Sequence, residues 1–462
     1  MQKLGTPTQP LTVAIVGSGP SGFYAAEALL QSEFTVEVSM IERLPVPYGL
    51  VRSGVAPDHP KLKQPILVYD KIAQSPGFSF FGNVHVGKDV AVSQLSSMYH
   101  AVIFACGAET DRRLGVPGEN LSGVHTATEF VGWYNGHPDY RERVFDLSQE
   151  VVAIVGQGNV AIDVARILSK TIDELKYSDI AEHALEALAD SKAREIHIIG
   201  RRGPAQAKFT SQELQELGTL ADCDPCVDPS ALNLSPEDAL EVTDKMNRNA
   251  AKNMRIFARF ASLPERGKTR CCYFHFLQSP QKVLGEIRVE GLRLAKNTLS
   301  GSAFHRIAEQ TDVTTDLPCG LIFRSIGYKG IALEGVPFDD QRGVIPNCEG
   351  RLINSASAVL YGLYVTGWIK RGPTGVIGTN RADSVATITT LLADLPMLNH
   401  VVKPGAAGLA EHLQKANRRF VTYSDWKKLD NHEIQKGLPK GKPREKFTRV
   451  PEMLAVISEQ AR

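Results

Sequence analysis

The sequence predicts the α/β fold class, with parallel sheets arranged in two similar units. Apolar runs of strand length alternate with longer segments of helical periodicity, which is typical of parallel sheets whose strands are joined by helices. A strand, a glycine turn and a helix around Gly17 recur about 140 residues later around Gly156. The chain has 462 residues, enough for more than one domain at roughly 100–200 residues each.

Strand positions follow from the apolar runs. The clearest strands are expected at Thr12–Val16, Val36–Ile41, Val102–Ala105, Val151–Val155, Glu195–Ile199 and Leu363–Thr366. Each is short and apolar, as strands buried on both faces of a parallel sheet are.

Two glycine-containing segments divide the chain. Ala108–Gly118 ends in GVPG and is interpreted as a linker out of the first unit, with Gly327–Gly330 as the return. We therefore expect a second unit, residues 109–327, inserted into a first unit formed by residues 1–108 and 328–462. Beyond Val401 the chain is polar and lysine-rich, and we expect a solvated extension packed on the outside.

Composition and charge exclude several classes of protein. Lysine plus arginine (52) against aspartate plus glutamate (51) gives a net charge of +1, so no bulk attraction to nucleic acid or anionic lipid is expected. No uncharged apolar run approaches the roughly 18–20 residues that cross a bilayer. The first ten residues have neither a signal core nor transit-peptide character, and seven thinly spread cysteines form no disulfide framework. We expect a cytoplasmic, bacterial protein.

The first glycine motif, GSGPSG at residues 17–22, follows an apolar strand and opens a helix. Gly17 permits the tight turn, Gly19 lets the backbone approach a pyrophosphate, and Gly22 lets helix and strand pack closely. Glu42 ends the next strand region, where a carboxylate accepts hydrogen bonds from a ribose 2′-hydroxyl. These features predict a dinucleotide with a free ribose, FAD or NAD. The alternative is a purely structural turn.

The second glycine motif, GQGNVA at residues 156–161, also lies between a strand and a helix. The following strand ends in Gly200-Arg201-Arg202 rather than in an acidic residue. A carboxylate there would repel a 2′-phosphate, whereas arginine forks bind it bidentately. The second unit is therefore predicted to bind NADP, unless the two arginines are an ordinary exposed pair.

Two dinucleotide sites in one chain indicate electron transfer between two redox cofactors. NADPH delivers a hydride, and FAD accepts two electrons and can release them singly. The predicted reaction is hydride transfer from the nicotinamide to flavin N5, so the protein is expected to be an oxidoreductase. The electron acceptor that oxidises the reduced flavin is then to be inferred from other residues of the sequence.

A disulfide acceptor needs a pair of redox cysteines near the flavin. Residues 43–70 contain no cysteine, and Cys223 and Cys226 form a CxxC motif that follows the second glycine motif by some 60 residues. Their acidic surroundings raise a thiol pKa rather than activate it. An NADPH-dependent disulfide reductase that uses this pair stays an alternative, as does a non-catalytic flavin redox sensor.

Several longer motifs resemble one family. GSGPSGFY, GLVRSGVAPDHP, GQGNVAIDVAR, GRRGPAQAKFT and GWIKRGPTGVIGTN closely resemble the adrenodoxin reductases and the adrenodoxin-reductase-type ferredoxin–NADP reductases. The resemblance runs from about residue 11 to about residue 385, with a family-like ending near Pro443–Ile457. It implies an FAD domain with an inserted NADP domain, and electron transfer from NADPH to a ferredoxin or adrenodoxin-like iron–sulfur protein. The terminal acceptor, a cytochrome P450 or another oxidoreductase, is left open.

The resemblance also assigns site residues. Besides the three motif glycines, it implies FAD contacts at Ser21, Glu42, Leu50, Val86, Trp368, Gly375, Val376 and Ile377. It implies NADP contacts at Gln157, Gly158, Asn159, Val160, Arg201, Arg202, Glu213 and Gly375. His59 and Asp163 match buried polar positions near the family's active site, where they would organise proton traffic or the nicotinamide pocket. A turn histidine and a helix-dipole aspartate are the alternatives.

A run of basic residues suggests a surface for the acceptor. Lys245, Arg248, Lys252, Arg255 and Arg259 recur at spacings of 3, 4, 3 and 4. On a helix these spacings place all five on one face. Ferredoxins are typically acidic, so such a face could guide docking. A solvated helix face is the alternative, because this segment does not align clearly with the family.

Overall fold

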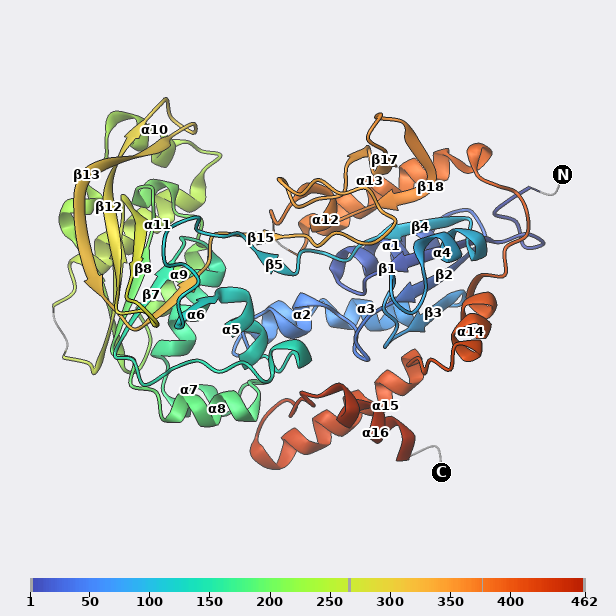
Figure 1. Cartoon of the computed structure of the whole chain (residues 1–462), viewed down its shortest axis with the longest axis horizontal. Helices are drawn as coiled ribbons and strands as arrows, with labels where there is room; N and C mark the ends of the chain where they lie inside the picture. Colours follow the sequence, from blue (N-terminus) through green and yellow to red (C-terminus); the bar gives the residue numbers. More distant parts are fainter. Residues whose placement is uncertain (1–2, 265–266, 376, 460–462) are drawn as a thin grey trace.

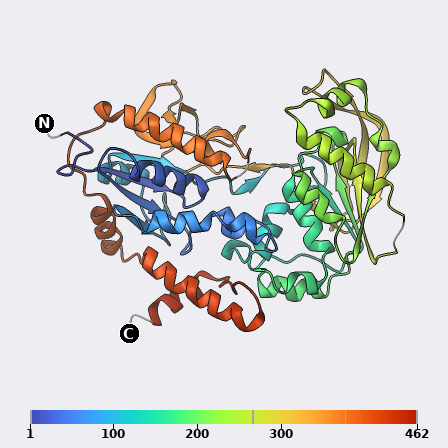
Figure 2. The same cartoon turned by 180° about the vertical axis from the view of Figure 1, so that it is seen from behind.

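The protein has two lobes, and the chain passes between them in segments that include β5 (Thr110–Asp111) and β15 (Tyr328–Lys329) (Figure 1). The structure is a computed structural model that describes residues 3–264, 267–375 and 377–459. Each lobe contains one large sheet, and the view from behind shows the same division (Figure 2). Between the lobes, β5 pairs antiparallel with β15, so the two connecting segments lie side by side.

The first large sheet draws its strands from both ends of the chain. Its seven strands are ordered β16-β17-β18-β4-β1-β2-β3. The parallel strands are β1 (Leu11–Val16), β2 (Val36–Ile41), β3 (Phe78–Phe81), β4 (Ala101–Phe104) and β18 (Val359–Val365), with β16 (Asn347–Cys348) and β17 (Arg351–Ile353) antiparallel at one edge. Helix α1 (Pro20–Leu30) packs closely on α13 (Thr379–Ala393), which brings the two ends of the chain together.

The second large sheet comes from the middle of the chain. Its six strands are all parallel and ordered β6-β14-β7-β8-β10-β9. Their bounds are Val124–Thr126, Leu321–Arg324, Val151–Val155, Glu195–Ile199, Arg270–His275 and Cys223–Val227, in that order. Helices α5 (Ala127–Tyr134), α6 (Asn159–Ser169), α9 (Ser211–Leu217) and α11 (Arg248–Ala261) contribute to the core on one face. An antiparallel sheet of β11 (Gln278–Leu284), β12 (Gly291–Ser300) and β13 (Ile307–Pro318) packs on the other.

The predicted strands agree well with the observed ones. Three predicted ranges, at β2, β7 and β8, coincide with the observed bounds, and those at β1 and β4 differ by one residue. The strand predicted at Leu363–Thr366 overlaps the last three residues of the longer β18, which ends at Val365. The α/β class with parallel sheets is therefore confirmed. None of the helices formed by the described residues is long and apolar enough to cross a membrane.

The C-terminal segment packs on the outside of the molecule as expected, but it also contributes buried side chains, so it is not simply a solvated extension. Helices α14 (Gly405–Lys415), α15 (Tyr423–Gly437) and α16 (Val450–Glu459) follow one another along the first lobe, and α15 extends below both lobes (Figures 1 and 2). Trp426, Leu429 and Met453 are almost fully buried in the core that includes α1.

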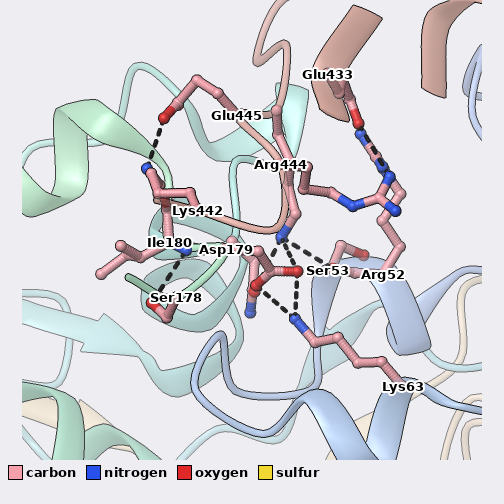
Figure 3. A network of polar contacts seen from close by, with 12 residues as sticks. Arg52, Ser53, Lys63, Ser178, Asp179, Ile180, Glu433, Lys442, Arg444 and Glu445 are labelled. Carbon is pink, nitrogen blue, oxygen red and sulfur yellow. Dashed lines mark hydrogen bonds and ion pairs between the residues drawn. The ribbon is translucent and has the colours of Figure 1, made fainter. Parts of the chain in front are cut away.

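Two lysines of this segment, Lys442 and Lys446, are buried in ion pairs, which a count of charges does not reveal (Figure 3). Asp179 of the second lobe lies between Lys63 Nζ, at 2.7 Å, and Lys446 Nζ, at 3.4 Å. Lys442 donates to the carbonyl of Ile180 at 2.7 Å and also contacts Glu445 at 2.6 Å. The C-terminal segment therefore contacts residues of both lobes.

Candidate active site

A cavity of about 2500 Å³ lies between the lobes and is lined by both glycine turns. Sites for a single small molecule usually measure about 300–1000 Å³. The residues that line it come from the carboxyl ends of β1, β2 and β4 in the first sheet and of β7 and β8 in the second. In open parallel sheets this end is where nucleotides bind. The cavity therefore has room for two dinucleotides end to end.

The first glycine turn has the shape that a pyrophosphate needs. Gly17 has φ +107°, and a Cβ there would lie 2.6 Å from the carbonyl oxygen of Ala105. A Cβ on Gly19 would meet no atom within 4 Å, so the backbone at Gly19 faces the open cavity at the start of α1. Glu42 accepts hydrogen bonds from Ser18 N at 3.1 Å and Ser18 Oγ at 2.6 Å, which hold its carboxylate beside the turn. These residues fit FAD.

Most of the other residues assigned to FAD line the same cavity. These are Ser21, Leu50, Val86, Trp368, Gly375 and Ile377. Val376 lies outside the described residues. Gly22 lies behind the turn instead, where a Cβ would come 2.2 Å from the carbonyl oxygen of Gly17, so it serves the predicted close packing. The buried Nε1 of Trp368 has no hydrogen-bond partner among the described residues, which leaves a donor for a bound group.

The second glycine turn is built in the same way but with opposite charge beside it. Gln157, Gly158, Asn159 and Val160 all line the cavity, and a Cβ on Gly158 would meet no atom within 4 Å. Arg201 is exposed and Arg202 half-buried at the end of β8, and both line the cavity. Burial and the neighbouring Arg201 lower the pKa of Arg202. The loop therefore carries two adjacent positive charges, a fit for a 2′-phosphate.

The two guanidinium groups at this turn have no direct partner among the described residues, although the carboxylate of Glu241 acts to raise the pKa of Arg202 against burial and Arg201. Among the described residues, none forms a hydrogen bond or ion pair with the side chain of Arg201 or Arg202. Most other half-buried arginines in the second lobe, such as Arg270 and Arg306, pair with an aspartate. Two unpaired cations in a cavity indicate a site for an anionic ligand rather than an ordinary ion-pair network.

Three buried polar side chains meet between the two turns. His59 comes from the turn before the short helix Pro60–Lys63, Asp163 from α6 and Glu213 from the first turn of α9. The nitrogen or oxygen atoms that they could offer to a metal ion all lie within 4.8 Å of one another. The Nδ1 atom of His59 is buried and has no partner among the described residues. All three residues line the cavity, so they can contact the reactive end of a nicotinamide.

The pKa values of all three groups are raised above their ordinary values. Burial raises the pKa of Asp163 to about 7, against the opposing effect of Arg166. Burial also raises the pKa of Glu213. Although burial disfavours the charged ring of His59, its hydrogen bond to Glu216 raises its pKa. Groups with pKa values near the working pH are suited to hold or pass protons.

Replacing Asp163 by asparagine is expected to raise the thermal midpoint, relative to wild type, more at pH 8 than at pH 5. In the unfolded chain this carboxyl loses its proton near pH 3.8, but in the folded protein it keeps the proton until about pH 7. The stabilisation that the folded protein gains from keeping this carboxyl neutral is therefore fully present below pH 4. It is lost as the pH rises through 7. At about 1.4 kcal/mol per pKa unit the loss is several kcal/mol.

Thermal melts of the two proteins at both pH values measure this difference. The exposed Asp316 provides the matched control, because Asp316→Asn should give the same difference from wild type at both pH values. A pH-independent difference for Asp163→Asn would contradict a protonated carboxyl at this position.

The cysteine pair lies away from the cavity. Cys223 and Cys226 are on β9, the edge strand of the second sheet, and neither lines the cavity. Their odd spacing on a strand points them to opposite faces. Burial raises the pKa of Cys223 to about 11 and that of Cys226 to about 12. This placement gives no support to a disulfide reductase that uses the pair.

The basic run is only partly helical. Arg248, Lys252, Arg255 and Arg259 lie on α11, are exposed and share one face. Lys245 precedes the helix in a turn, so its predicted place on the helical stripe was wrong. The helix starts at Arg248 because Asp244, Lys245 and Met246 form a turn in which Asp244 Oδ1 accepts from Met246 N at 2.7 Å.

Glu216 is a site residue that the sequence analysis missed. Its Oε2 lies 2.8 Å from His59 Nε2, and it comes from the same helix as Glu213. The two glutamates are three residues apart, a spacing that places both on one face of a helix. That spacing was the signal that could have identified it.

Known proteins resemble this chain over nearly its whole length. A family model described as pyridine nucleotide-disulphide oxidoreductase matches residues 11–198. The mitochondrial NADPH:adrenodoxin oxidoreductase of Salvelinus fontinalis is 45% identical over 98% of this chain and 92% of its own length. The NADPH-ferredoxin reductase FprA of Mycobacterium leprae is 45% identical over 96% of this chain and 98% of its own.

A solved structure extends the likeness to the whole fold. The structure of Mycobacterium tuberculosis FprA in complex with NADPH matches with a TM-score of 0.90 at 42% identity, over 97% of this chain and 100% of that one. The resemblance expected from the motifs is therefore confirmed. This chain belongs to the family of the adrenodoxin reductases and the FprA-type NADPH–ferredoxin reductases.

Proposed function

We propose that the protein is an FAD-dependent oxidoreductase that passes electrons from NADPH to a ferredoxin or adrenodoxin-like iron–sulfur protein. The observation that carries this proposal is the pair of glycine turns facing one cavity with opposite charges beside them. Glu42 at the first turn suits the free ribose of FAD, and the unpaired Arg201 and Arg202 at the second suit the 2′-phosphate of NADPH. The near full-length likeness to NADPH-ferredoxin reductases supports it.

Each half of the cavity would hold one cofactor. FAD, when bound, supplies a two-electron acceptor for one hydride from NADPH and can return the two electrons one at a time. We assign to FAD the first turn, Glu42, Leu50, Val86, Trp368 and the segment Gly375–Ile377. We assign to NADP the residues Gln157–Val160, Arg201, Arg202, Glu213 and, at its nicotinamide end, Gly375. His59 and Asp163 lie between the two sets, where they hold protons and orient the nicotinamide.

We infer that the lobes correspond to two domains, with residues 1–108 and 328–462 binding FAD and residues 109–327 binding NADP. The pairing of β5 with β15 places both connections in one narrow ribbon, which supports these bounds. The four exposed basic residues of α11, which belong to the NADP domain, form the proposed contact for an acidic iron–sulfur partner.

The function is tested by reduction of cytochrome c with NADPH, with and without an added acidic ferredoxin. The ferredoxin is expected to raise the rate by at least about tenfold, and NADH to support little of it. Reversing the four charges of α11 by glutamate should lower the ferredoxin-dependent rate and its sensitivity to salt. Reduction of ferricyanide, which needs no docking surface, should stay the same.

The matched control reverses Lys282 and Lys296, exposed lysines of the three-stranded sheet in the same lobe. Those changes should leave the ferredoxin-dependent rate intact. Rapid flavin reduction by NADPH with no response to any ferredoxin would overturn the proposed acceptor. Loss of turnover on alkylation of Cys223 and Cys226 would favour a disulfide reductase. Slow reduction of the flavin by NADPH would favour a redox sensor.

A further inference from the structure

Arg166 of α6 is a buried guanidinium surrounded by carboxylates. Its side chain is 1% exposed. Its Nη1 lies 2.8 Å from Asp163 Oδ1, and its Nη2 lies 3.0 Å from Glu216 Oε2. Nη2 also pairs with Asp58 Oδ2, which Lys170 Nζ contacts at 2.8 Å. One guanidinium therefore joins three acidic groups from three separate segments.

These segments belong to different lobes. Asp58 lies in the turn that leads from the first lobe into the short helix at Pro60, whereas Asp163 and Glu216 are on α6 and α9 of the second. The residue next to Asp58 is His59, whose Nε2 lies 2.8 Å from Glu216 Oε2. Arg166 thus contacts both the neighbour of His59 in the chain and its hydrogen-bond partner.

We propose that Arg166 is a positioning residue that holds His59 and Asp163 in the nicotinamide part of the cavity. It does so by fixing the Asp58–His59 turn of one lobe against α6 and α9 of the other. This inference rests on the proposed function, because it concerns how the two cofactor sites are kept in register.

The chemistry of the guanidinium explains why arginine suits this position. Its planar fork presents several N–H donors in fixed directions, so it can serve three carboxylates at once. A lysine ammonium at the same place would keep the charge but could not span the same three acceptors from one buried point. Without any cation, Asp58, Asp163 and Glu216 would be crowded in a buried space with only Lys170 and His59 to balance them.

Removing the charge would also shift the titration of the site. The positive charge of Arg166 lowers the pKa values of Asp58, Asp163, Glu216 and His59. The other charged groups facing this cluster, Lys170 and Glu213, stay in place. The pH midpoint of any rate that depends on the cluster is therefore expected to move upward in the absence of Arg166.

Two variants of the holoprotein test the proposal: Arg166→Met, which removes the charge, and Arg166→Lys, which keeps it. Flavin reduction by saturating NADPH is followed by stopped flow between pH 5.5 and pH 9. Misplacement of a reacting group by about 1 Å can cost about 100-fold in rate, so a loss of that size is expected for Arg166→Met. The dissociation constant for NADPH should change by less than about threefold, because the phosphate contacts at Arg201 and Arg202 remain.

A second readout does not depend on turnover. Backbone amides of the turn, such as His59 N donating to the carbonyl of Ala56 at 3.1 Å, should exchange hydrogen faster in Arg166→Met than in wild type. Arg166→Lys should show faster exchange there too, with a smaller loss of rate and the pH midpoint of wild type. Arg351→Met, which breaks a pair with the buried Asp394 away from the cavity, is the control and should change none of these.

An unchanged rate and unchanged exchange in Arg166→Met would overturn the proposal. A lower rate with the wild-type pH midpoint and normal exchange at residues 56–62 would also overturn it, because the loss of rate would then not arise from displacement of the Asp58–His59 turn. If Arg166→Met does not fold, Arg166→Lys decides by its exchange at the turn. If NADPH does not reduce the flavin of the wild-type protein, the proposed function is refuted instead. The hydrogen-exchange measurement would still test whether Arg166 positions the turn.

Discussion

Replacing Gly19 by valine is expected to give a folded protein that has lost its yellow flavin. The backbone at Gly19 has φ −77° and ψ −177°, which valine adopts readily, and its Cβ would meet no protein atom within 4 Å. The added methyl groups would instead occupy the space at the start of α1 where the FAD pyrophosphate approaches the backbone. Overpacking of this kind costs about 1–3 kcal/mol or more, a fall in affinity of about 5- to 150-fold or greater.

The chain offers a reciprocal control in the second turn. Gly158 is equally open, with φ −123° and ψ 175°, so Gly158→Val should fold and keep its flavin. Its flavin should no longer be reduced by NADPH at concentrations that saturate wild type. Absorbance at 450 nm per protein measures the first variant, and anaerobic NADPH titration measures the second. A yellow Gly19→Val protein that NADPH fails to reduce would show that the two turns had been assigned the wrong way round.

Removing the paired arginines is expected to change the choice between NADPH and NADH. In the double variant Arg201→Ala, Arg202→Ala, the KM for NADPH should rise by about 100-fold or more, because each charge-assisted hydrogen bond to phosphate contributes about 1.5–3 kcal/mol. The KM for NADH should change by less than about threefold, since NADH has no 2′-phosphate. Steady-state reduction of ferricyanide with each cofactor measures both values.

The matched control for this pair is Arg293→Ala. Arg293 is half-buried on β12 of the same lobe and pairs with Asp316 rather than lining the cavity. It should leave both KM values unchanged. Equal increases for NADPH and NADH in the double variant would refute the assignment of the 2′-phosphate site to Arg201 and Arg202.

Local patterns in the sequence predicted much of this molecule. The strands β2, β7 and β8 follow from short segments rich in apolar residues, and the turns at Gly17 and Gly156 follow from glycine spacing between a strand and a helix. Both signals are local, because a buried strand and a tight turn each depend on a few neighbouring residues. Both predicted turns are present, and the structure places them on one cavity.

What the sequence did not predict depends on contacts between distant residues. Nothing near Lys446 in the chain indicates that it is buried beside Asp179, about 270 residues earlier. The place of Glu216 beside His59 likewise requires the two lobes to meet. The prediction that Lys245 lies on the helical stripe was wrong for the opposite reason. A local turn at Asp244 keeps Lys245 out of the helix although its spacing is helical.

The division of the first sheet between the two ends of the chain affects how the protein forms during synthesis. Strand β4 ends at Phe104, and its neighbour β18 begins at Val359, about 250 residues later. Every strand of the second sheet, the last of which ends at Arg324, is synthesised within that interval. The growing chain therefore carries an open β4 edge while the whole of the second sheet becomes available, and this edge can close only when the ribosome has passed Val365.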